Sequence, residues 1–218
     1  MLINSLNDMN MKKCALFIIG FMIIFCGCGK DYFHDTGLAN GKHDCTIWEY
    51  MQQDRENWDS TILVIKRAGP QSLFDGTDGE NKEITFFGPT NMSIMQFLFK
   101  TVDEEYEMMY SSIDDIPVEI CRQFILSHVI REKWLSTDFE FENKGTLTGG
   151  SEETNLAGNP LRIYRTKGEY MGIPGIGAET LYVHSLTFGH IVLIASSNIE
   201  MTNGTVHSLS NSYQFTEL

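Results

Sequence analysis

Apolar residues recur at helical spacing from residue 46 onward. Thr46 and Glu49 stand three positions apart, as in a capping box whose two side chains satisfy the first free amides of a helix, so a short helix is predicted over residues 46–54. A second helix is predicted over residues 59–70, from an Asp-Ser-Thr start signal to a Gly-Pro stop. Its apolar block at 62–65 fits a strand equally well by composition, and the pattern leaves the two open.

A strand that leads directly into a helix is predicted further along. Residues 84–87, ITFF, are rich in β-branched and aromatic residues, and a Gly-Pro pair ends the strand. Thr90 or Asn91 can then cap a helix that runs to about Val102. Another helix is predicted over 117–130, where a proline occupies the favoured first turn.

After residue 131 the pattern changes to short segments with alternating or β-branched residues, separated by Gly, Asn and Pro. Such segments are typical of antiparallel strands joined by turns. The predicted strands are residues 139–142, 146–149, 161–166, 179–188 and 190–201. Helices gathered in the first half and strands in the second predict an α+β fold, in which helices from the N-terminal half pack on a sheet.

The last predicted feature is a hairpin closed by Asn203 and Gly204. Both central positions of its two-residue turn need positive φ, which Asn and Gly tolerate best. Ile199 and Met201 before the turn and Val206 after it share one face, which predicts one buried side. A register slip of one residue would turn the first two outward. We expect this hairpin to complete the sheet and core and not to form an active site.

The N-terminal 27 residues do not fit this domain and resemble an export signal. Lys12-Lys13 precede an uninterrupted apolar run of 13 residues, 14–26, which is shorter than the about 20 residues that cross a bilayer. We therefore expect residues 1–27 to be a signal peptide. A start at Met11, directly before the two lysines, is an alternative that looks more natural than Met1.

The end of this apolar run resembles a bacterial lipoprotein box, in which a small residue precedes the cysteine that is acylated. Cys28 is the better candidate because Gly27 precedes it, whereas bulky Phe25 precedes Cys26. Phe25 also stands where the box usually has an aliphatic residue, and an ordinary secretory signal or an apolar anchor are the alternatives. With Cys28 acylated, residues 28–44 would form a lipidated tether at the cell envelope, expected at the outer membrane of a Gram-negative bacterium.

The acidic composition limits the classes of partner. The chain has 16 basic and 29 acidic residues and a formal charge of −13, which argues against nucleic acid because phosphate backbones are bound chiefly by Lys and Arg. Beyond the lipid site only Cys45 and Cys121 remain, without a spacing signature, so separate thiols are expected and a disulfide is the alternative. No Cys/His group has zinc spacing, and we expect no cofactor.

Histidines are the first candidates for chemistry. His128 and His207 stand alone in their segments, where a histidine more often makes structural hydrogen bonds than acts as a base or ligand. His184 and His190 flank a predicted turn, but their six-residue separation fixes no metal geometry. There is no G-x-S-x-G motif, and Cys121 lies about two helical turns before His128, too far for a direct hydrogen bond. We therefore predict no catalytic residue.

Three further segments offer weaker candidates. Residues 75–81 are rich in oxygen donors but lack the spacing of a calcium loop, so a solvated loop is expected. Residues 172–177 resemble a phosphate-binding loop only superficially, since a proline interrupts them and no helix follows; a flexible connection between strands is expected. Tyr164, Tyr170 and Tyr182 could stack on sugars, although aromatics in strands are usually core or cross-strand partners.

Two segments resemble the signature blocks of the fasciclin domain family. Residues 84–98, ITFFGPTNMSIMQFL, resemble the first block, a strand running into Phe-Ala-Pro-Thr-Asn and a helix, with Gly88 in place of the usual Ala. Residues 196–213 resemble the second block, which has a strand, an Asn-Gly turn and a Val-or-Ile-His pair. Between them, residues 124–130 resemble the family's helix ending in Tyr-His, with Ser127 replacing the Tyr.

This resemblance implies a fasciclin-like β-sandwich or wedge over residues 45–218 and a helix at 62–65. Members of the family generally mediate adhesion or extracellular interactions and are not typically enzymes. We therefore expect a lipid-anchored extracytoplasmic binding or adhesion module that engages a protein or a glycan at the cell envelope. An accessory glycan-binding lipoprotein of an outer-membrane polysaccharide uptake system is the alternative, and an enzyme is least supported. A contiguous aromatic platform would favour the glycan, and a broad exposed apolar patch would favour the protein.

Overall fold

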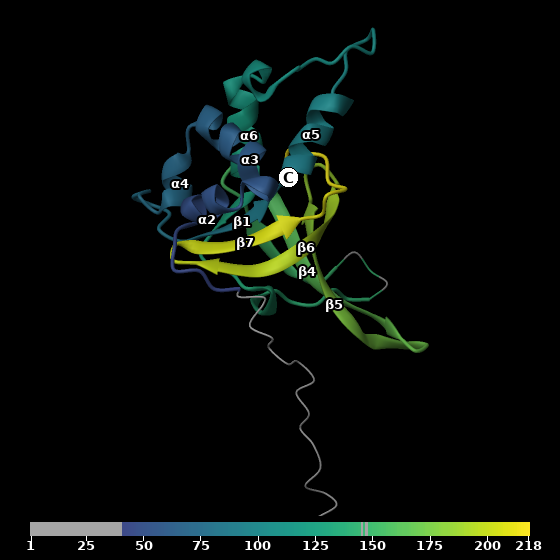
Figure 1. Ribbon diagram of the computed structural model, residues 1–218. Coiled ribbons are helices and arrows are strands. Elements are labelled where there is room, and N and C mark those ends of the chain that lie inside the picture. Colours follow the sequence, from purple (N-terminus) through teal and green to yellow (C-terminus); the bar gives the residue numbers. More distant parts are fainter. Residues whose placement is uncertain (1–40, 145, 147) are drawn as a thin grey trace, which may run out of the picture. The chain divides into compact units, whose positions relative to one another are not determined.

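The computed structural model describes residues 41–144, 146 and 148–218 (Figure 1). The predicted signal peptide, Cys28 and nearly all of the tether lie outside these residues. The α-helices are α2 (Ile47–Gln53), α3 (Arg55–Ala68), α4 (Gln71–Asp75), α5 (Asn91–Lys100) and α6 (Val118–Ser127), with short 3₁₀ turns at Ile113–Asp115 and Ser136–Asp138. The strands are β1 (Ile84–Gly88), β2 (Val129–Arg131), β3 (Ser151–Thr154), β4 (Pro160–Tyr170), β5 (Ile173–Ser185), β6 (Ile191–Met201) and β7 (Gly204–Leu209).

All seven strands form one sheet in the order β2-β1-β7-β6-β5-β4-β3. The C-terminal strand β7 lies near its centre, parallel to β1 with Phe86 opposite Val206, and antiparallel to β6. At the other ends of the sheet, Ile130 of β2 forms an antiparallel bridge with Asn155, just beyond β3. The sheet is therefore nearly closed, and the α+β prediction is confirmed.

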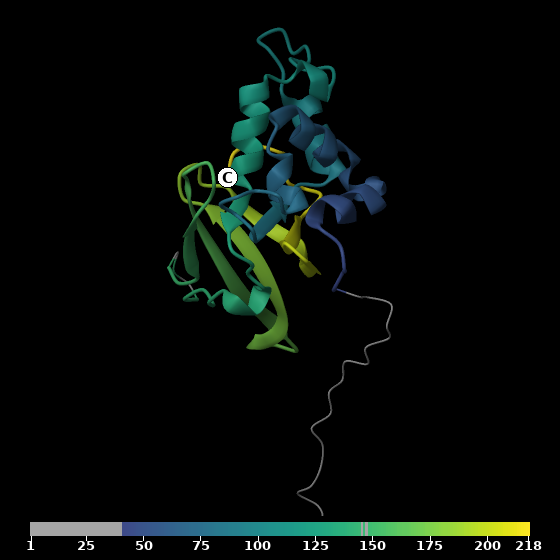
Figure 2. The same cartoon turned by 90° about the vertical axis from the view of Figure 1, so that its left-hand side faces the viewer.

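Two hydrophobic cores lie on the two faces of this sheet. Successive residues of a strand point to opposite faces, so Phe86 packs beneath the helices with Ile62 and Ile94, whereas Phe87 packs inside the curved sheet with Ile163 and others. The helices gather over β1 and β7 (Figures 1 and 2). The core beneath the helices thus contains residues from both the start and the end of the domain.

Several predicted helix boundaries are correct. Thr46 and Glu49 form both hydrogen bonds of the capping box at the start of α2. Gly69 ends α3 in the left-handed conformation, and the block at 62–65 is helical, as the family resemblance implied. However, α3 begins at Arg55 and not at the Asp-Ser-Thr signal, because the chain continues from α2 into α3 through a single residue, Asp54.

Other predictions were wrong, correct only in part or untested. Residues 139–142 do not form a strand; they contribute isolated bridges only, such as Phe141 with Arg165. The predicted strand 146–149 includes Leu147, which lies outside the described residues. Pro117 occupies the N-cap of α6 and not its first turn. Thr90 is the N-cap of α5, but its hydroxyl hydrogen-bonds to the side chain of Asn211 and not to the helix.

The turn of the closing hairpin lies one residue earlier than predicted. Met201 pairs with Gly204, so Thr202 and Asn203 are its central residues. Neither has positive φ, because Asn203 is held by buried contacts: its side chain accepts a hydrogen bond from the Ile47 amide and donates one to the Phe74 carbonyl. The prediction that the hairpin completes the core is nevertheless confirmed, since Met201 and Val206 are buried.

Gly88 stands where the family usually has alanine, and the neighbouring Trp58 explains the difference. A Cβ atom at Gly88 would lie 2.5 Å from the Trp58 ring. The indole, which is 2% exposed, fills the space that the alanine methyl would occupy. The small Gly88 and the large Trp58 ring therefore fill the space at the strand-to-helix corner together.

Candidate functional site

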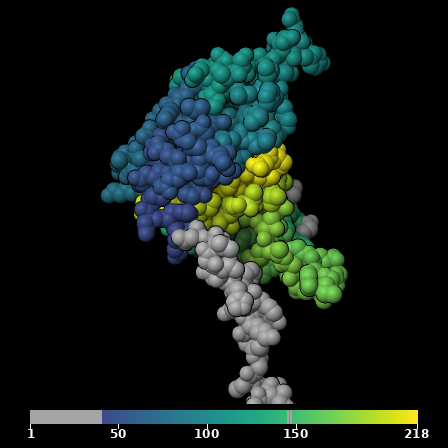
Figure 3. Space-filling view, viewed as in Figure 1, coloured from purple at the N-terminus to yellow at the C-terminus, as the bar shows by residue number. Residues whose placement is uncertain are grey.

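The β4–β5 hairpin extends beyond the rest of the sheet. Its two strands pair from Leu161 with Ser185 as far as Tyr170 with Ile173. The neighbouring strands stop earlier: β3 pairs with β4 only up to Ile163, and β6 pairs with β5 only from Tyr182 onward. The outer part is therefore a two-stranded ribbon, which projects from the domain (Figures 1 and 3).

The turn of this hairpin has positive φ at both central residues, the geometry that the sequence predicted for Asn203 and Gly204. Met171 and Gly172 have φ values of 51° and 80°, as in a type I′ turn. A non-glycine residue in the left-handed region costs about 1 kcal/mol, and methionine lacks the short polar side chain with which Asn or Asp compensates. Met171 is also 84% exposed. A methionine at this position therefore does not contribute to the folding of the hairpin.

The other residues near the tip are apolar as well. Tyr170, Ile173 and Ile176 each expose more than half of their surface, and the tip also contains Pro174. A two-stranded ribbon is marginally stable in water, and solvent-facing apolar residues add little to it. Exposed apolar residues that stability does not require are candidates for an interaction surface. We refer to Tyr170, Met171, Ile173 and Ile176 as the hairpin tip.

Glycines in the hairpin serve its backbone. A Cβ atom on Gly177 would overlap the backbone of Gly168 and Glu169, where the register shifts between Lys167 and Glu169. Gly172 and Gly175 have positive φ. The expected flexible connection at 172–177 is therefore corrected: this segment holds part of a tight turn and the first residues of β5, and its glycines permit a bulge and a close strand crossing.

A pocket of about 270 Å³ lies at the base of the ribbon. Its lining includes Phe141, Arg165, Lys167 and Gly175. The Arg165 guanidinium lies 4.1 Å and the Lys167 ammonium 5.1 Å from the centre of the Phe141 ring. Both cations also pair with Glu179, at 3.4 and 3.0 Å, and its pKa is lowered by the hydrogen bond from Lys167. Lys144 and Glu142 also line the pocket, so its cations are largely balanced by Glu142 and Glu179, with a small excess of basic residues.

The three candidate tyrosines do not form a common surface. Tyr164 and Tyr182 stack on each other with ring centres 5.5 Å apart, as cross-strand partners, and Tyr164 is only 7% exposed. Tyr170 stands apart, at the hairpin tip. The residues that the structure describes therefore place no contiguous aromatic platform at these three positions, whereas the hairpin tip carries four exposed apolar side chains.

His128 is a structural residue, as predicted. It is fully buried at the end of α6, and its Nδ1 lies 2.6 Å from the Phe124 carbonyl oxygen, which can only accept. Nδ1 therefore carries the proton, and Nε2 lies 2.9 Å from the Tyr213 hydroxyl, whose single proton is shared between Nε2 and the Thr216 carbonyl at 3.1 Å. Burial lowers the pKa of His128 to about 4, and burial also raises the pKa of Tyr213. The pair is neutral at physiological pH.

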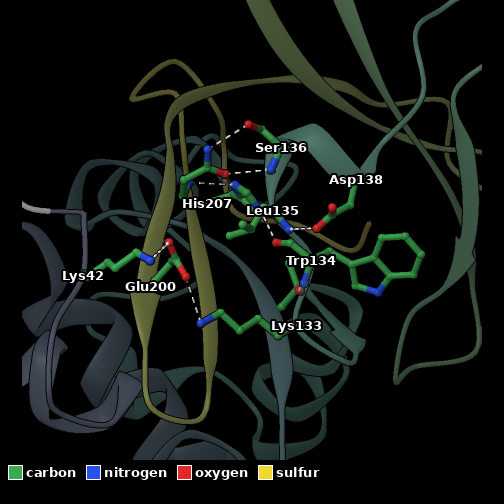
Figure 4. Close-up of polar contacts among 10 residues, drawn as sticks. Lys42, Lys133, Trp134, Leu135, Ser136, Asp138, Glu200 and His207 are labelled. Atoms are coloured by element: carbon green, nitrogen blue, oxygen red, sulfur yellow. Dashed lines mark hydrogen bonds and ion pairs between the residues drawn. The ribbon is translucent and has the colours of Figure 1, made fainter.

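His207 has the same structural role in the middle of the sheet (Figure 4). Its Nε2 donates to the Trp134 carbonyl at 3.1 Å, and its Nδ1 accepts from the Asn198 amide at 3.4 Å. Phe87 stacks on the ring at 5.8 Å. Burial lowers its pKa to about 4. The imidazole fixes the segment after β2 against β7.

A salt-bridge cluster near this histidine fastens the start of the described chain (Figure 4). Glu200 of β6 lies 3.0 Å from the Lys133 ammonium and 3.7 Å from that of Lys42. Its backbone hydrogen-bonds to Gly41 and His43, along the part of β6 that does not pair with β5. These residues, which the sequence places in the tether, extend the sheet.

The remaining candidates stay apart. His184 lies on β5 opposite Arg162, and burial lowers its pKa. In the loop 75–81 the carboxylates of Asp75 and Asp78 accept hydrogen bonds from their own loop, as expected for a solvated turn. Cys45 and Cys121 are free thiols, as expected. Within the described residues no three His, Cys, Asp or Glu side chains are grouped to hold a metal ion.

The apolar hairpin tip was missed by the sequence reasoning. The available signal was the segment Tyr-Met-Gly-Ile-Pro-Gly-Ile, which has turn glycines but none of the polar residues that normally accompany them.

No helix in residues 41–144 or 148–218 combines the length and apolar character of a membrane span.

A family model described as "Fasciclin domain" matches residues 56–212 of the chain. Among solved structures, a FAS1 domain pair from the insect cell adhesion molecule fasciclin I matches at 14% sequence identity and a TM-score of 0.49. The match covers 74% of this chain and 46% of the insect chain, so this chain spans about half the length of that relative. No curated protein matches the chain.

Proposed function

Because the chain belongs to the fasciclin domain family, whose domains are typically adhesion or binding modules, we propose that it is a lipid-anchored protein-binding module of the cell envelope. The hairpin tip is its contact element. The exported domain would be held at the membrane through acylated Cys28, with the residues up to about 40 as a tether, and the partner would be an envelope or extracellular protein.

One observation carries this proposal: Met171 is 84% exposed in a left-handed backbone conformation, at the end of a projecting ribbon of exposed apolar residues. Strained and exposed apolar residues that folding does not require point to a function. Protein interfaces use methionine, tyrosine and isoleucine in this manner, as apolar anchors that enter a partner's pocket.

A protein fits this surface better than a glycan. Glycan sites use open aromatic faces, but Tyr164 and Tyr182 are engaged with each other and only Tyr170 is free at the tip. Aliphatic side chains at the other three tip positions offer a sugar neither stacking faces nor hydrogen bonds. The pocket around Arg165 and Lys167 would add a contact for an acidic side chain of the partner.

The family and the surroundings of the candidate residues in the described part of the chain both argue against catalysis. His128 and His207 are neutral, buried and fully engaged with carbonyl, hydroxyl and amide groups, so neither can act on a bound substrate. Cys121 is buried, and burial raises its pKa, which suppresses the nucleophilic thiolate.

Photo-crosslinking in intact cells tests the contact element. A photo-reactive amino acid is placed at Ile176 of the full chain, and the matched control places it at Leu63, an exposed residue of α3. We expect a discrete protein adduct from position 176 that disappears when Met171→Asn and Ile173→Asn are added, and no such adduct from position 63.

The crosslinking results, together with a polysaccharide-binding assay, separate the alternatives. Equal adducts from positions 63 and 176, or an adduct that persists in the Met171→Asn and Ile173→Asn chain, would contradict the role of the hairpin tip. Saturable binding of the full chain to polysaccharides, lost in Tyr170→Ala without any protein adduct, would support the glycan-binding lipoprotein instead.

A further inference from the structure

Helix α5 is apolar on two opposite faces. Ile94 and Phe97 point into the core beneath the helices and are buried. Met92, Met95 and Phe99 follow one another at spacings of three and four residues, so they form a stripe along the outer face, and each is more than 40% exposed. A surface helix normally has polar residues on that face. Among the described residues, none covers the outer stripe of α5.

The loop after α5 extends this apolar surface. Val102 and Met108 form an antiparallel bridge, and Met109 donates from its amide to the Thr101 carbonyl at 3.0 Å. Met108 and Met109 are both about half exposed. The loop is held in shape by Asp103, whose carboxylate accepts from two amides of the loop at 2.9 and 3.0 Å. The surface is thus preorganised, with methionine, a side chain that adapts to varied partners, as its main component.

The segment that follows the stripe is rich in acidic side chains. Residues 91–115 contain one basic residue, Lys100, and six acidic ones, which are Asp103, Glu104, Glu105, Glu107, Asp114 and Asp115. Lys100 hydrogen-bonds to Gln96 on its own helix. Asp103 and Asp115 cap their own turns, while the other four carry their charge on exposed positions. An apolar stripe that continues into an acidic loop is complementary to an amphipathic segment that carries basic residues.

We propose that α5 and the loop 101–109 form a docking surface for a basic amphipathic helical segment of a partner protein. The stripe from Met92 to Phe99 is about 10 Å long, which matches two turns of a facing helix with apolar residues at positions i, i+3 or i+4, and i+7. Lysine or arginine residues beside that face would meet Glu104, Glu105 and Glu107.

The charge of the chain selects this partner over others. A second copy carries the same net charge of −13 and would bring two acidic loops together. An anionic lipid surface is repelled in the same way. This surface lies at the opposite end of the domain from the hairpin tip (Figures 1 and 2), and it does not depend on the function proposed for that hairpin.

Fluorescence anisotropy with synthetic peptides tests the proposal. The probe is a labelled 18-residue helical peptide of leucine and lysine with its leucines at i, i+3, i+4 and i+7. It is titrated with the full chain, purified in a non-ionic detergent, and micelles alone serve as the blank. Comparison peptides replace each lysine with glutamate or scramble the same composition so that the apolar stripe is lost.

We expect saturable binding of the basic amphipathic peptide and at least about tenfold weaker binding of both comparison peptides. Met95→Gln with Phe99→Gln should weaken binding by about tenfold, and Glu104→Lys with Glu105→Lys should weaken it and reduce its salt dependence. Met171→Asn with Ile173→Asn, at the hairpin tip, should leave it unchanged. All substituted side chains are exposed, and an unchanged melting temperature shows that each variant is folded.

Absence of binding to the unmodified chain overturns the proposal, as does equal binding of the acidic or scrambled peptide. Unchanged affinity in both the apolar and the charge variants does the same. Weaker binding in the hairpin variant with full binding in the α5 variants would place the peptide at the hairpin tip and would also refute the α5 surface.

Discussion

The side chain of Asn203 accepts a 2.8 Å hydrogen bond from the backbone amide of Ile47, 156 positions earlier in the chain. Through its NH₂ group it also donates to the Phe74 carbonyl at 2.9 Å. One buried amide at the tip of the closing hairpin therefore satisfies the first turn of α2 and the last turn of α4 together. These two bonds fasten the final hairpin of the domain to its first helix.

Asn203→Ala should lower the free energy of unfolding by about 2–4 kcal/mol, because it leaves the Ile47 amide and the Phe74 carbonyl buried without partners. Urea denaturation of the full chain measures this loss. Asn57→Ala is the matched control, since Asn57 is exposed and bonds only to Asp54; a change below about 0.5 kcal/mol is expected there. Equal losses in the two variants would contradict the role of Asn203.

Gly204→Ala should be among the most damaging single substitutions. A Cβ atom there would overlap the Ile84 carbonyl oxygen, because β1 runs directly beside this residue, and φ is 151°. Neither strand can move without breaking the parallel pair at the centre of the sheet. Gly79→Ala, where nothing lies within 4 Å of the new atom, should leave the melting temperature nearly unchanged. A tolerated Gly204→Ala would show that β1 and β7 are not in this register.

Stability should fall in mild acid. His128 and His207 have folded-state pKa values of about 4, below the usual 6.5, so the unfolded chain binds protons that the folded chain does not. The contribution of the two neutral, buried histidines to stability is complete above about pH 6.5 and is lost as the pH falls toward 4. Urea midpoints between pH 7 and 4 measure it.

The substitution His207→Gln should make that pH dependence shallower while lowering stability at pH 7. His190→Gln, at an exposed position, should leave both unchanged. A pH profile of His207→Gln that parallels the unmodified chain would mean that other groups cause the acid sensitivity.

Met171→Asn should stabilise the projecting hairpin locally, because asparagine adopts the left-handed conformation at lower cost. The expected gain of up to about 1 kcal/mol corresponds to about fivefold slower amide exchange at Tyr170 and Ile173. Met171→Val should exchange faster, since a β-branched residue fits this conformation poorly. Slower exchange in the valine variant would argue against the turn geometry.

Cys28→Ser should release the full chain from the membrane fraction if Cys28 carries the lipid. The separation of membranes from soluble extract, followed by immunoblotting, measures it. Cys26→Ser is the control and should remain with the membranes, because Cys26 follows the bulky Phe25. Membrane association that persists in Cys28→Ser, or is lost equally in Cys26→Ser, would favour an apolar anchor or another attachment.

Local signals predicted much of the fold. The capping box at Thr46, the stop at Gly69 and the strand-to-helix corner at Pro89 each depend on neighbouring residues, and all appear where expected. The structural roles of His128 and His207 were also predicted. The errors fell where distant contacts decide. Residues 139–142 have the alternation of a strand, but their pairing stops at isolated bridges such as that of Phe141 with Arg165.

The amino-acid sequence by itself determined the α+β character, the family and the buried pattern of the closing hairpin, because these follow from propensity, periodicity and local turn chemistry. Tertiary structure alone decided the place of that hairpin in the centre of the sheet and the geometry of the two turns. Asn203 and Gly204 resemble a type I′ turn, yet the long-range bonds of Asn203 impose another register, and the type I′ turn forms at Met171 and Gly172 instead. Exposure likewise depends on what packs nearby, so only the fold shows that the apolar hairpin tip and the outer stripe of α5 face solvent.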